Sequence, residues 1–262
     1  MADKLFLLLV VTSFPVVRAA IPNVICMIEH CSSQMKDCYE DSDCKNAMVC
    51  MIGCGTSNQT CVFNCFFSYE NEIFDNFMKC IVTDYKCMEI PPLNPPVKCH
   101  RPTNIQTTFE MESLIGSWII VLGKNQIYDC FNCQNTTYIQ AHEGLFSAVE
   151  HYDIKAIDGT IKHRTTFESI VQWNATTPGI LKYNSRQMGL EIHSEWRVLD
   201  YGTDYIFAYY CGSISSNYFY EGAVVYSKSV TLSNDTLSKL KKVATDAGLD
   251  LNTFCKPSYN SC

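Results

Sequence analysis

The sequence predicts a two-part protein: a small disulfide-rich α-helical domain, followed by a mainly β domain folded as an up-and-down antiparallel barrel with a C-terminal helix. Three observations lead to this fold class. Ten of the sixteen cysteines lie between Cys26 and Cys87, a density typical of a disulfide framework. From about Thr107 the chain shows short strand patterns separated by turn residues. Its last part then changes to a helical period.

Residues 1–20 have the pattern of a secretory signal peptide. Lys4 precedes the apolar run Leu5–Val11, and small residues close the segment at Ala19 and Ala20. The run is shorter than the ~20 apolar residues that a membrane-spanning helix needs. We therefore expect a protein that is secreted, or lumenal in the secretory pathway, without a transmembrane anchor.

Glycosylation motifs and net charge agree with that route. Four N-x-S/T motifs predict glycans at Asn58, Asn135, Asn174 and Asn234. The net charge of −7, with no basic block, argues against nucleic acids and anionic membranes as partners.

The cysteine spacing predicts antiparallel helices in residues 21–90. Cys50 and Cys54 are four residues apart, as are Cys61 and Cys65, so each pair shares one helix face. A Gly- and Asn-containing turn separates the two pairs. Closely spaced C-x-x-C pairs are lacking in this region, which argues against a zinc cluster, and we predict no metal site. Nesting suggests the following bridges, although the sequence leaves the connectivity open: Cys26–Cys44, Cys31–Cys38, Cys50–Cys65, Cys54–Cys61 and Cys80–Cys87.

Residues 91–103 form a semi-rigid Pro-rich linker, and residues 104–262 form the barrel domain. Alternation is clearest from Leu190 to Val198, where Ser194 and Trp196 share the apolar face. Ser233 is a candidate N-cap for the final helix, which Gly248 ends. The predicted strands are Gly116–Gly123, Phe146–Ala156, Thr160–Gln172, Gly179–Asn184, Leu190–Leu199, Tyr205–Cys211 and Gly222–Ser229.

Two short motifs resemble the signature regions of lipocalins, which are eight-stranded antiparallel barrels. They are Gly116-Ser-Trp118 at the first strand and Thr203-Asp-Tyr205 before a late one, with Lys228 after the last. The resemblance implies that Trp118 closes one end of a lipocalin-like barrel and that Lys228 packs across it.

A closer resemblance covers nearly the whole chain. The cysteine pattern, the linker, Phe131-Asn-Cys-Gln134, Asp204–Tyr210 and Gly222–Tyr226 look like the violaxanthin de-epoxidase family. That resemblance implies removal of epoxide oxygens from xanthophylls, with ascorbate as reductant at acidic pH. It also implies a Cys133–Cys262 disulfide. The four remaining cysteines, Cys99, Cys130, Cys211 and Cys255, are then expected to form two further bridges.

The resemblance is weaker at the positions that correspond to the family's candidate catalytic residues. Opening an epoxide needs a proton donor inside an apolar cavity. The family's candidate catalytic aspartate corresponds to Ser194, and a cavity glutamine corresponds to Glu168. We therefore predict that the family's acid is lost, and that Tyr210, Glu168 and Asp129 are the remaining catalytic candidates. An ordinary core tyrosine and an exposed loop aspartate are the alternatives for Tyr210 and Asp129. The predicted ligand-binding residues are Trp196, Tyr210, Phe207, Tyr226, Gln134 and Ser194.

The expected function is a secreted lipocalin-type protein that binds a hydrophobic isoprenoid or carotenoid-like molecule, with no cofactor required for binding. The first alternative is a de-epoxidase-like oxidoreductase that uses ascorbate and acts on epoxy-xanthophylls or a related lipid. The second is an extracellular matrix or interaction protein. The oligomeric state stays open.

Overall fold

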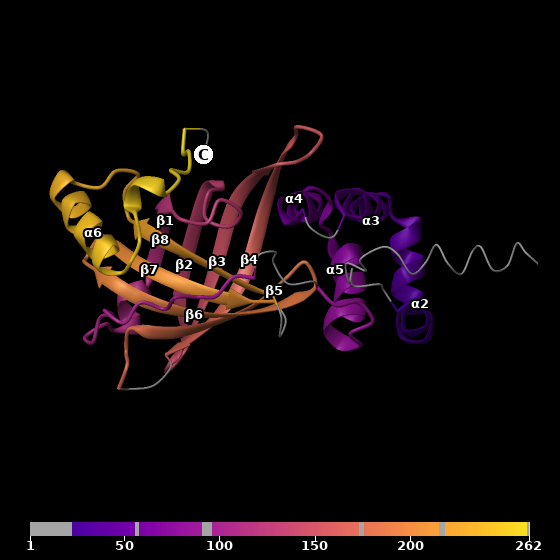
Figure 1. Cartoon of the computed structure of the whole chain (residues 1–262), viewed down its shortest axis with the longest axis horizontal. Helices are drawn as coiled ribbons and strands as arrows, with labels where there is room; N and C mark the ends of the chain where they lie inside the picture. The colour runs from indigo at the N-terminus through magenta and orange to yellow at the C-terminus, as the bar shows by residue number, and fades with distance from the viewer. Residues whose placement is uncertain (1–22, 56–57, 91–95, 173–175, 215–217, 261) are drawn as a thin grey trace, which may run out of the picture.

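The computed structural model describes residues 23–55, 58–90, 96–172, 176–214, 218–260 and 262. The predicted signal peptide and the motif at Asn174 therefore lie outside the described residues. Helices α2 to α5 stack against one end of a closed antiparallel barrel, and helix α6 packs on its outer face toward the other end (Figure 1). The predicted fold class, a lipocalin-like eight-stranded barrel with a C-terminal helix and a disulfide-rich helical domain before it, is confirmed.

The cysteine module, residues 23–90, consists of short helices with side-chain N-caps. Asn23, Asp41, Asn58 and Asn71 each accept a hydrogen bond from a backbone N–H in the first turn of the helix that follows. The helices are α2 (Val24–Glu40), α3 (Ser42–Cys54), α4 (Gln59–Tyr69) and α5 (Glu72–Met78), followed by a π-helical turn at Lys79–Asp84.

All sixteen cysteines form disulfides, but three predicted module pairs are wrong. The predicted Cys50–Cys65 and Cys54–Cys61 bridges join α3 to α4 as expected. Cys31 and Cys38 cannot pair because both belong to α2, about two turns and ~10 Å apart. Instead of Cys26–Cys44, Cys31–Cys38 and Cys80–Cys87, the module contains Cys26–Cys87, Cys31–Cys80 and Cys38–Cys44. Helix α2 is thus bridged to the returning C-terminal part of the module, a long-range pairing that local nesting does not reveal.

Eight strands close the barrel in sequence order, each pairing with its neighbours and β1 pairing with β8. The predicted strands correspond to all of them except β2. Its buried positions are Gln134, Thr136 and Tyr138, so β2 lacks the apolar alternation that marks the other strands. The bounds are β1 (Gly116–Gly123), β2 (Asn132–His142), β3 (Leu145–Lys155), β4 (Ile161–Gln172), β5 (Ile180–Gln187), β6 (Leu190–Tyr201), β7 (Tyr205–Ser213) and β8 (Phe219–Ser227).

Trp118 closes the barrel at the end where β1 begins, away from the module. Its indole Nε1 donates to the carbonyl oxygen of Leu114 at 2.6 Å, and the Lys228 ammonium lies 4.8 Å from its ring centroid. These contacts agree with the roles that the lipocalin resemblance implied for both residues.

Helix α6 (Asn234–Asp246) covers the outer face of β7 and β8. Ser233 caps it as predicted, and two residues of the helix, Leu240 and Ala244, are fully buried against the barrel. Phe207 belongs to this outer cluster and contacts Phe254, with ring centroids 6.3 Å apart. Its prediction as a ligand-binding residue is therefore wrong, because alternation along β7 turns Phe207 away from the interior.

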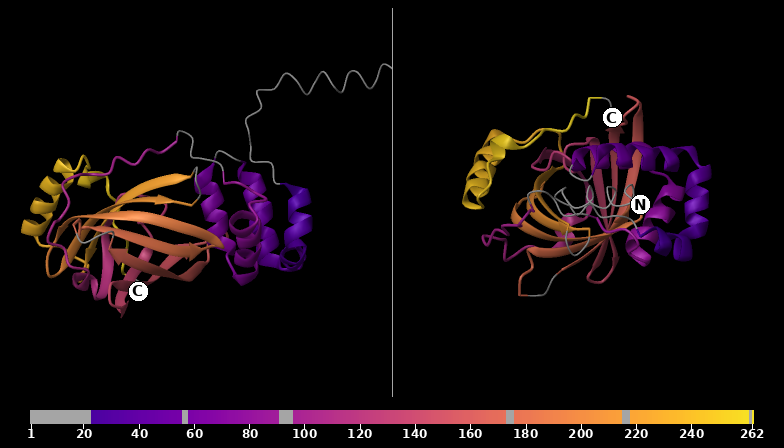
Figure 2. Two further views of the ribbon diagram at one scale, coloured as in Figure 1. Left: turned by 90° about the horizontal axis from the view of Figure 1, so that it is seen from below. Right: turned by 45° about the vertical axis from the view of Figure 1, so that its right-hand side comes forward.

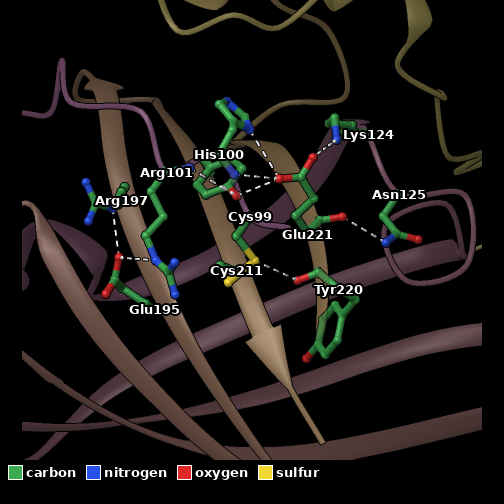
Figure 3. Close-up of a disulfide and its surroundings, with 11 residues drawn as sticks. Cys99, His100, Arg101, Lys124, Asn125, Glu195, Arg197, Cys211, Tyr220 and Glu221 are labelled. Carbon is green, nitrogen blue, oxygen red and sulfur yellow. Dashed lines mark hydrogen bonds and ion pairs between the residues drawn. A yellow bond between two sulfur atoms is a disulfide. The ribbon is translucent and has the colours of Figure 1, made fainter. Parts of the chain in front are cut away.

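Residues 96–103 of the linker run along the outside of the barrel (Figure 2) and are attached there by a disulfide and a charged network. Cys99 pairs with Cys211 of β7, and Glu221 binds both His100 and Lys124 beside it (Figure 3). Burial alone would raise the pKa of Glu221, but hydrogen bonds from Tyr209, Lys124 and His100 hold it at about 2.

The module packs directly on the barrel. Arg164 of β4 donates to the carbonyl oxygens of Glu70 and Phe67, and Thr83 donates to that of Gly189 at 2.9 Å. Gly189 has a φ of +71°, and a Cβ there would lie 2.1 Å from the carbonyl oxygen of Asp75, so the close approach requires glycine. In the described part of the chain, no helix is long and apolar enough to span a membrane.

Candidate functional site

The barrel interior contains a cavity near its module end, enclosing about 80 Å³. Its wall combines polar and acidic side chains with aromatic ones, and two phenylalanines of the module, Phe63 and Phe67, contribute to it. The polar and stacked aromatic side chains of this wall include Asp129, Gln134, Glu150, Glu168, Ser194, Trp196, Tyr210 and Tyr226.

Asp129 is held by the loop between β1 and β2. Its Oδ2 accepts from the backbone N–H of Asn125 at 2.8 Å, and the neighbouring Cys130 is bridged to Cys255. A Cβ at Gly123 would lie only 2.4 Å from the Cβ of Asp129, so this glycine makes room for the loop. Asp129 is only 3% exposed, which corrects the alternative of an exposed loop aspartate.

Tyr210 of β7 faces Asp129 across the cavity. The tyrosine hydroxyl donates to Asp129 Oδ1 at 2.6 Å, a short hydrogen bond between two buried groups. Gly222 of β8 pairs with Tyr210 on the neighbouring strand β7, and a Cβ on this glycine would lie 2.2 Å from the Tyr210 hydroxyl. The glycine of the Gly222–Tyr226 segment thus provides space for the tyrosine ring.

The burial of Asp129 sets its protonation. Burial raises the pKa of Asp129 to about 7, although the hydrogen bonds from Tyr210 and Asn125 oppose the rise. Burial also raises the pKa of Tyr210 far above its ordinary value, and the Asp129 charge adds to this. Near neutral pH the pair therefore holds an exchangeable carboxyl proton, while the phenol stays protonated.

Two glutamates line the cavity on neighbouring strands. Glu150 of β3 accepts from Gln134 Nε2 at 2.8 Å and from Thr166 Oγ1 at 3.3 Å. Burial raises the pKa of Glu150 against these hydrogen bonds. Burial, and then the charge of Glu150, raise the pKa of Glu168 to about 8. Because like charges disfavour joint ionisation, the cavity favours a protonated Glu168 at neutral pH.

Stacked aromatic rings form the apolar wall. Trp196 of β6 stacks between Tyr183 and Tyr210, with ring centroids 4.5 and 5.0 Å away. Its indole Nε1 donates to Ser194 Oγ at 2.9 Å, and Tyr226 lies 6.2 Å from it, also stacked. Such a wall suits a flat, conjugated or ring-shaped molecule.

The structure brings together every predicted catalytic and ligand-binding residue except Phe207 in this one cavity. Sequence reasoning missed Glu150, although strand alternation with Phe146, Ala148 and Tyr152 places it on the inward face of β3. It also missed Phe63 and Phe67, for which no local signal exists because they come from the other part of the molecule. The roles of all these residues remain predictions.

The arrangement can deliver a proton to an oxygen of a neutral, hydrophobic ligand. A protonated Asp129 beside Tyr210 is a general acid matched to mildly acidic or neutral pH. Among the described residues, the one group spaced to share a metal ion is Cys50, Cys54 and Cys65, and each of these sulfurs already forms a disulfide.

Among solved structures, similar barrels include lobster apocrustacyanin A1 and the cockroach allergen Per a 4. The first is 17% identical over 58% of this chain and 81% of its own, with a TM-score of 0.46. The second is 14% identical over 63% of this chain and 97% of its own, with a TM-score of 0.48. Both TM-scores lie below 0.5, and the closed eight-stranded topology itself shows the fold.

Sequence relatives cover more of the chain. Violaxanthin de-epoxidase of Arabidopsis thaliana is 28% identical over 93% of this chain, and that of Nicotiana tabacum is 27% identical over 93%. These matches cover 54% and 52% of the relatives, so the chain spans about half their length. The family described as VDE lipocalin domain matches residues 23–259. The chain therefore belongs to the VDE lipocalin domain family.

Proposed function

We propose that this protein binds a hydrophobic, isoprenoid or carotenoid-like ligand in the barrel cavity and protonates an oxygen of that ligand. The observation that carries the proposal is the buried Asp129–Tyr210 hydrogen bond at 2.6 Å, with the pKa of Asp129 raised to about 7. The stacked wall of Trp196 holds an apolar ring beside this acid. Asp129 thus supplies an acid in place of the one expected to be lost at Ser194.

The reaction that fits this site is the reductive opening of an epoxide. Asp129 donates a proton to the epoxide oxygen as the carbon–oxygen bonds break, and the oxygen leaves as water after taking a second proton. Ascorbate, a co-substrate, supplies two electrons and two protons and becomes dehydroascorbate, so an alkene, water and dehydroascorbate are the products. The relatives named violaxanthin de-epoxidase support this class of reaction for the matched part of their length.

Binding without turnover is the second candidate. Ser194, the nearest hydrogen-bond partner of Trp196, is a hydroxyl at a cavity position where an acid was expected. A serine cannot replace a carboxylic acid as proton donor at this pH, because its pKa is far too high. A protein that binds xanthophyll tightly and leaves its epoxide intact would match this candidate.

The eight disulfides support an oxidising compartment, and we propose secretion along the pathway that the N-terminal sequence predicts. Asn58 and Asn234 are exposed and suit glycosylation, whereas Asn135 is half-buried with its Oδ1 fully enclosed. We therefore expect glycans at Asn58 and Asn234 rather than at Asn135.

The test is violaxanthin turnover with ascorbate, followed by absorbance, for the full mature protein and its Asp129→Asn variant. Asp129→Asn should lower kcat by about 10²–10⁴-fold, the usual cost of losing a positioned acid, while ligand affinity changes little. Glu143→Gln, at an exposed turn, is the matched control. Tyr210→Phe should move the alkaline limb of the pH–rate profile upward, because the lost hydrogen bond had lowered the pKa of Asp129. Unchanged turnover in Asp129→Asn would refute the acid role, and binding without turnover in the unmodified protein would favour the second candidate.

A further inference from the structure

A second apolar site lies outside the barrel, on the cysteine module. It is a groove between α3, α4 and the segment that ends at Ile90, and it encloses about 390 Å³. We call it the methionine groove, because Met48, Met51, Met78 and Met88 line it. Among the described residues that line it, Gln59, Glu89 and the Tyr218 hydroxyl are the polar exceptions.

The groove and the barrel cavity share a wall. Phe63 of α4 lines both, so one aromatic ring has the cavity on one side and the groove on the other. Its ring contacts Tyr128 of the cavity and Tyr218 of the groove, with centroids 5.3 and 6.2 Å away. The hydroxyls of these two tyrosines lie 3.4 Å apart. We call Phe63, Tyr128 and Tyr218 the aromatic partition.

The barrel cavity and the methionine groove differ in size and polarity. Such a difference is expected if each binds a different part of one ligand. The cavity holds acids but encloses only about 80 Å³, whereas sites for small-molecule ligands typically span about 300–1,000 Å³. The groove, at about 390 Å³, falls in that range but holds little polar chemistry. Methionine side chains are flexible and polarisable, so they adapt to a long apolar molecule of variable shape.

We propose that the methionine groove binds the apolar polyene part of an isoprenoid ligand whose ring enters the barrel cavity past the aromatic partition. This inference rests on the proposed function for the identity of the ligand end at Asp129, but it assigns a separate role to the module. The module is then half of the binding site and not merely a stabilising appendage. Ile52, 77% exposed at the rim, extends the apolar surface along which such a chain approaches.

The test compares a long and a short isoprenoid probe. All-trans-retinol carries a ring and a polyene tail, whereas β-ionone carries a similar ring and only a short tail. Met51 is half-buried in the groove, so Met51→Trp should fill it and weaken retinol binding about tenfold or more through lost apolar contact, with β-ionone binding unchanged. Isothermal titration calorimetry on the full mature protein measures both affinities.

Matched variants separate groove filling from damage to the fold. Val49→Trp adds the same ring to α3 at a position that is 64% exposed and does not line the groove, so it should bind both probes normally. Met51→Leu keeps the groove apolar and should retain retinol affinity. If Met51→Trp unfolds, as shown by its circular dichroism, Met48→Trp fills the same groove from the preceding turn and takes its place.

The outcomes separate this inference from the proposed function. Equal retinol affinity in Met51→Trp and Val49→Trp would overturn the groove site, whatever the enzyme activity. A parallel loss of β-ionone binding would also overturn it, because the effect would not be confined to the tail. If retinol binding depends on Met51 but no epoxide is turned over, the proposed reaction is contradicted and the groove site is still supported. An unmodified protein that binds no retinol would contradict the groove site directly.

Discussion

The cysteine module and the barrel use disulfides for different purposes. In the module, five bridges hold together short helices, and the longest of these has 17 residues. In the barrel, strand ladders close the sheet, and the three bridges attach the linker, the β1–β2 loop and the C-terminal tail to it. Disulfides thus supplement a small core in one region, and they position the linker and the Asp129 loop in the other.

Reduction of the disulfides should give the largest difference between the two regions, because it should unfold the cysteine module while the barrel stays folded. Each module bridge contributes about 2–4 kcal/mol, so losing five removes about as much as the whole stability of a typical domain. The barrel strands keep their hydrogen-bonded ladders. After reduction and alkylation, hydrogen exchange should be fast in α2 to α5 and remain slow in β6 to β8. Simultaneous loss of protection in helices and strands would contradict the difference between the regions.

The pH dependence of stability should have opposite signs for two carboxyl groups, Asp129 of the barrel and Asp41 of the module. The pKa of Asp129 is raised to about 7 by burial, so its contribution is full below pH ~4 and is lost as the pH rises through about 7. The difference between 3.8 and about 7 corresponds to about 4 kcal/mol at most. The pKa of Asp41 is lowered by hydrogen bonds from Cys44 and Asn71, so its contribution is present above pH ~4 and is lost below that.

Urea unfolding at pH 5 and pH 8 measures the effect. The unmodified protein should be more stable at pH 5, and Asp129→Asn should reduce the difference. Asp158→Asn, in an exposed turn, should leave it unchanged. If Asp129→Asn kept the full difference, the pH dependence would belong to another group.

Replacing either of two glycines by alanine should give the smallest changes in stability, and the two changes should have opposite signs. Gly53 lies in α3 with open space around it, so Gly53→Ala should stabilise the module by about 0.5–1 kcal/mol. Gly222→Ala should destabilise the barrel by about 1–3 kcal/mol, because its Cβ would displace the Tyr210 ring. Thermal unfolding checks both, and turnover should fall only in Gly222→Ala. A Gly222→Ala variant with full activity would mean that the position of Tyr210 is not critical.

Sequence patterns predicted the fold well where each pattern depends only on residues close together in the chain. Ser233, the alternation around Trp196 and the i, i+4 cysteines of α3 and α4 all have this character. The prediction for Cys31 was wrong because its partner, Cys80, lies 49 residues away and is reached only by folding. Strand β2 was missed because its interior side chains are polar.

Several of the residues that line the candidate site were predicted from the sequence, but the protonation of its acidic groups was not. Alternation placed Ser194 and Trp196 on one face of their strand, and the family resemblance pointed to Tyr210, Gln134 and Asp129. The burial of Asp129 depends on a loop held by Gly123, Cys130 and Cys255, three positions brought together only by the fold. The raised pKa on which its proposed role as an acid depends follows from that burial and so could not be read from the sequence.

The Cys99–Cys211 bridge also limits how far the module can travel. Cys87 is fixed in the module and Cys99 is fixed on β7, and the 11 residues between them could span at most about 40 Å if fully extended. A tether this short keeps the local concentration of the module at the barrel in the millimolar range. Contacts such as those of Arg164 therefore need not be tight to keep the barrel end covered. Exchange of modules between two molecules is correspondingly disfavoured, because a neighbour competes at a far lower concentration.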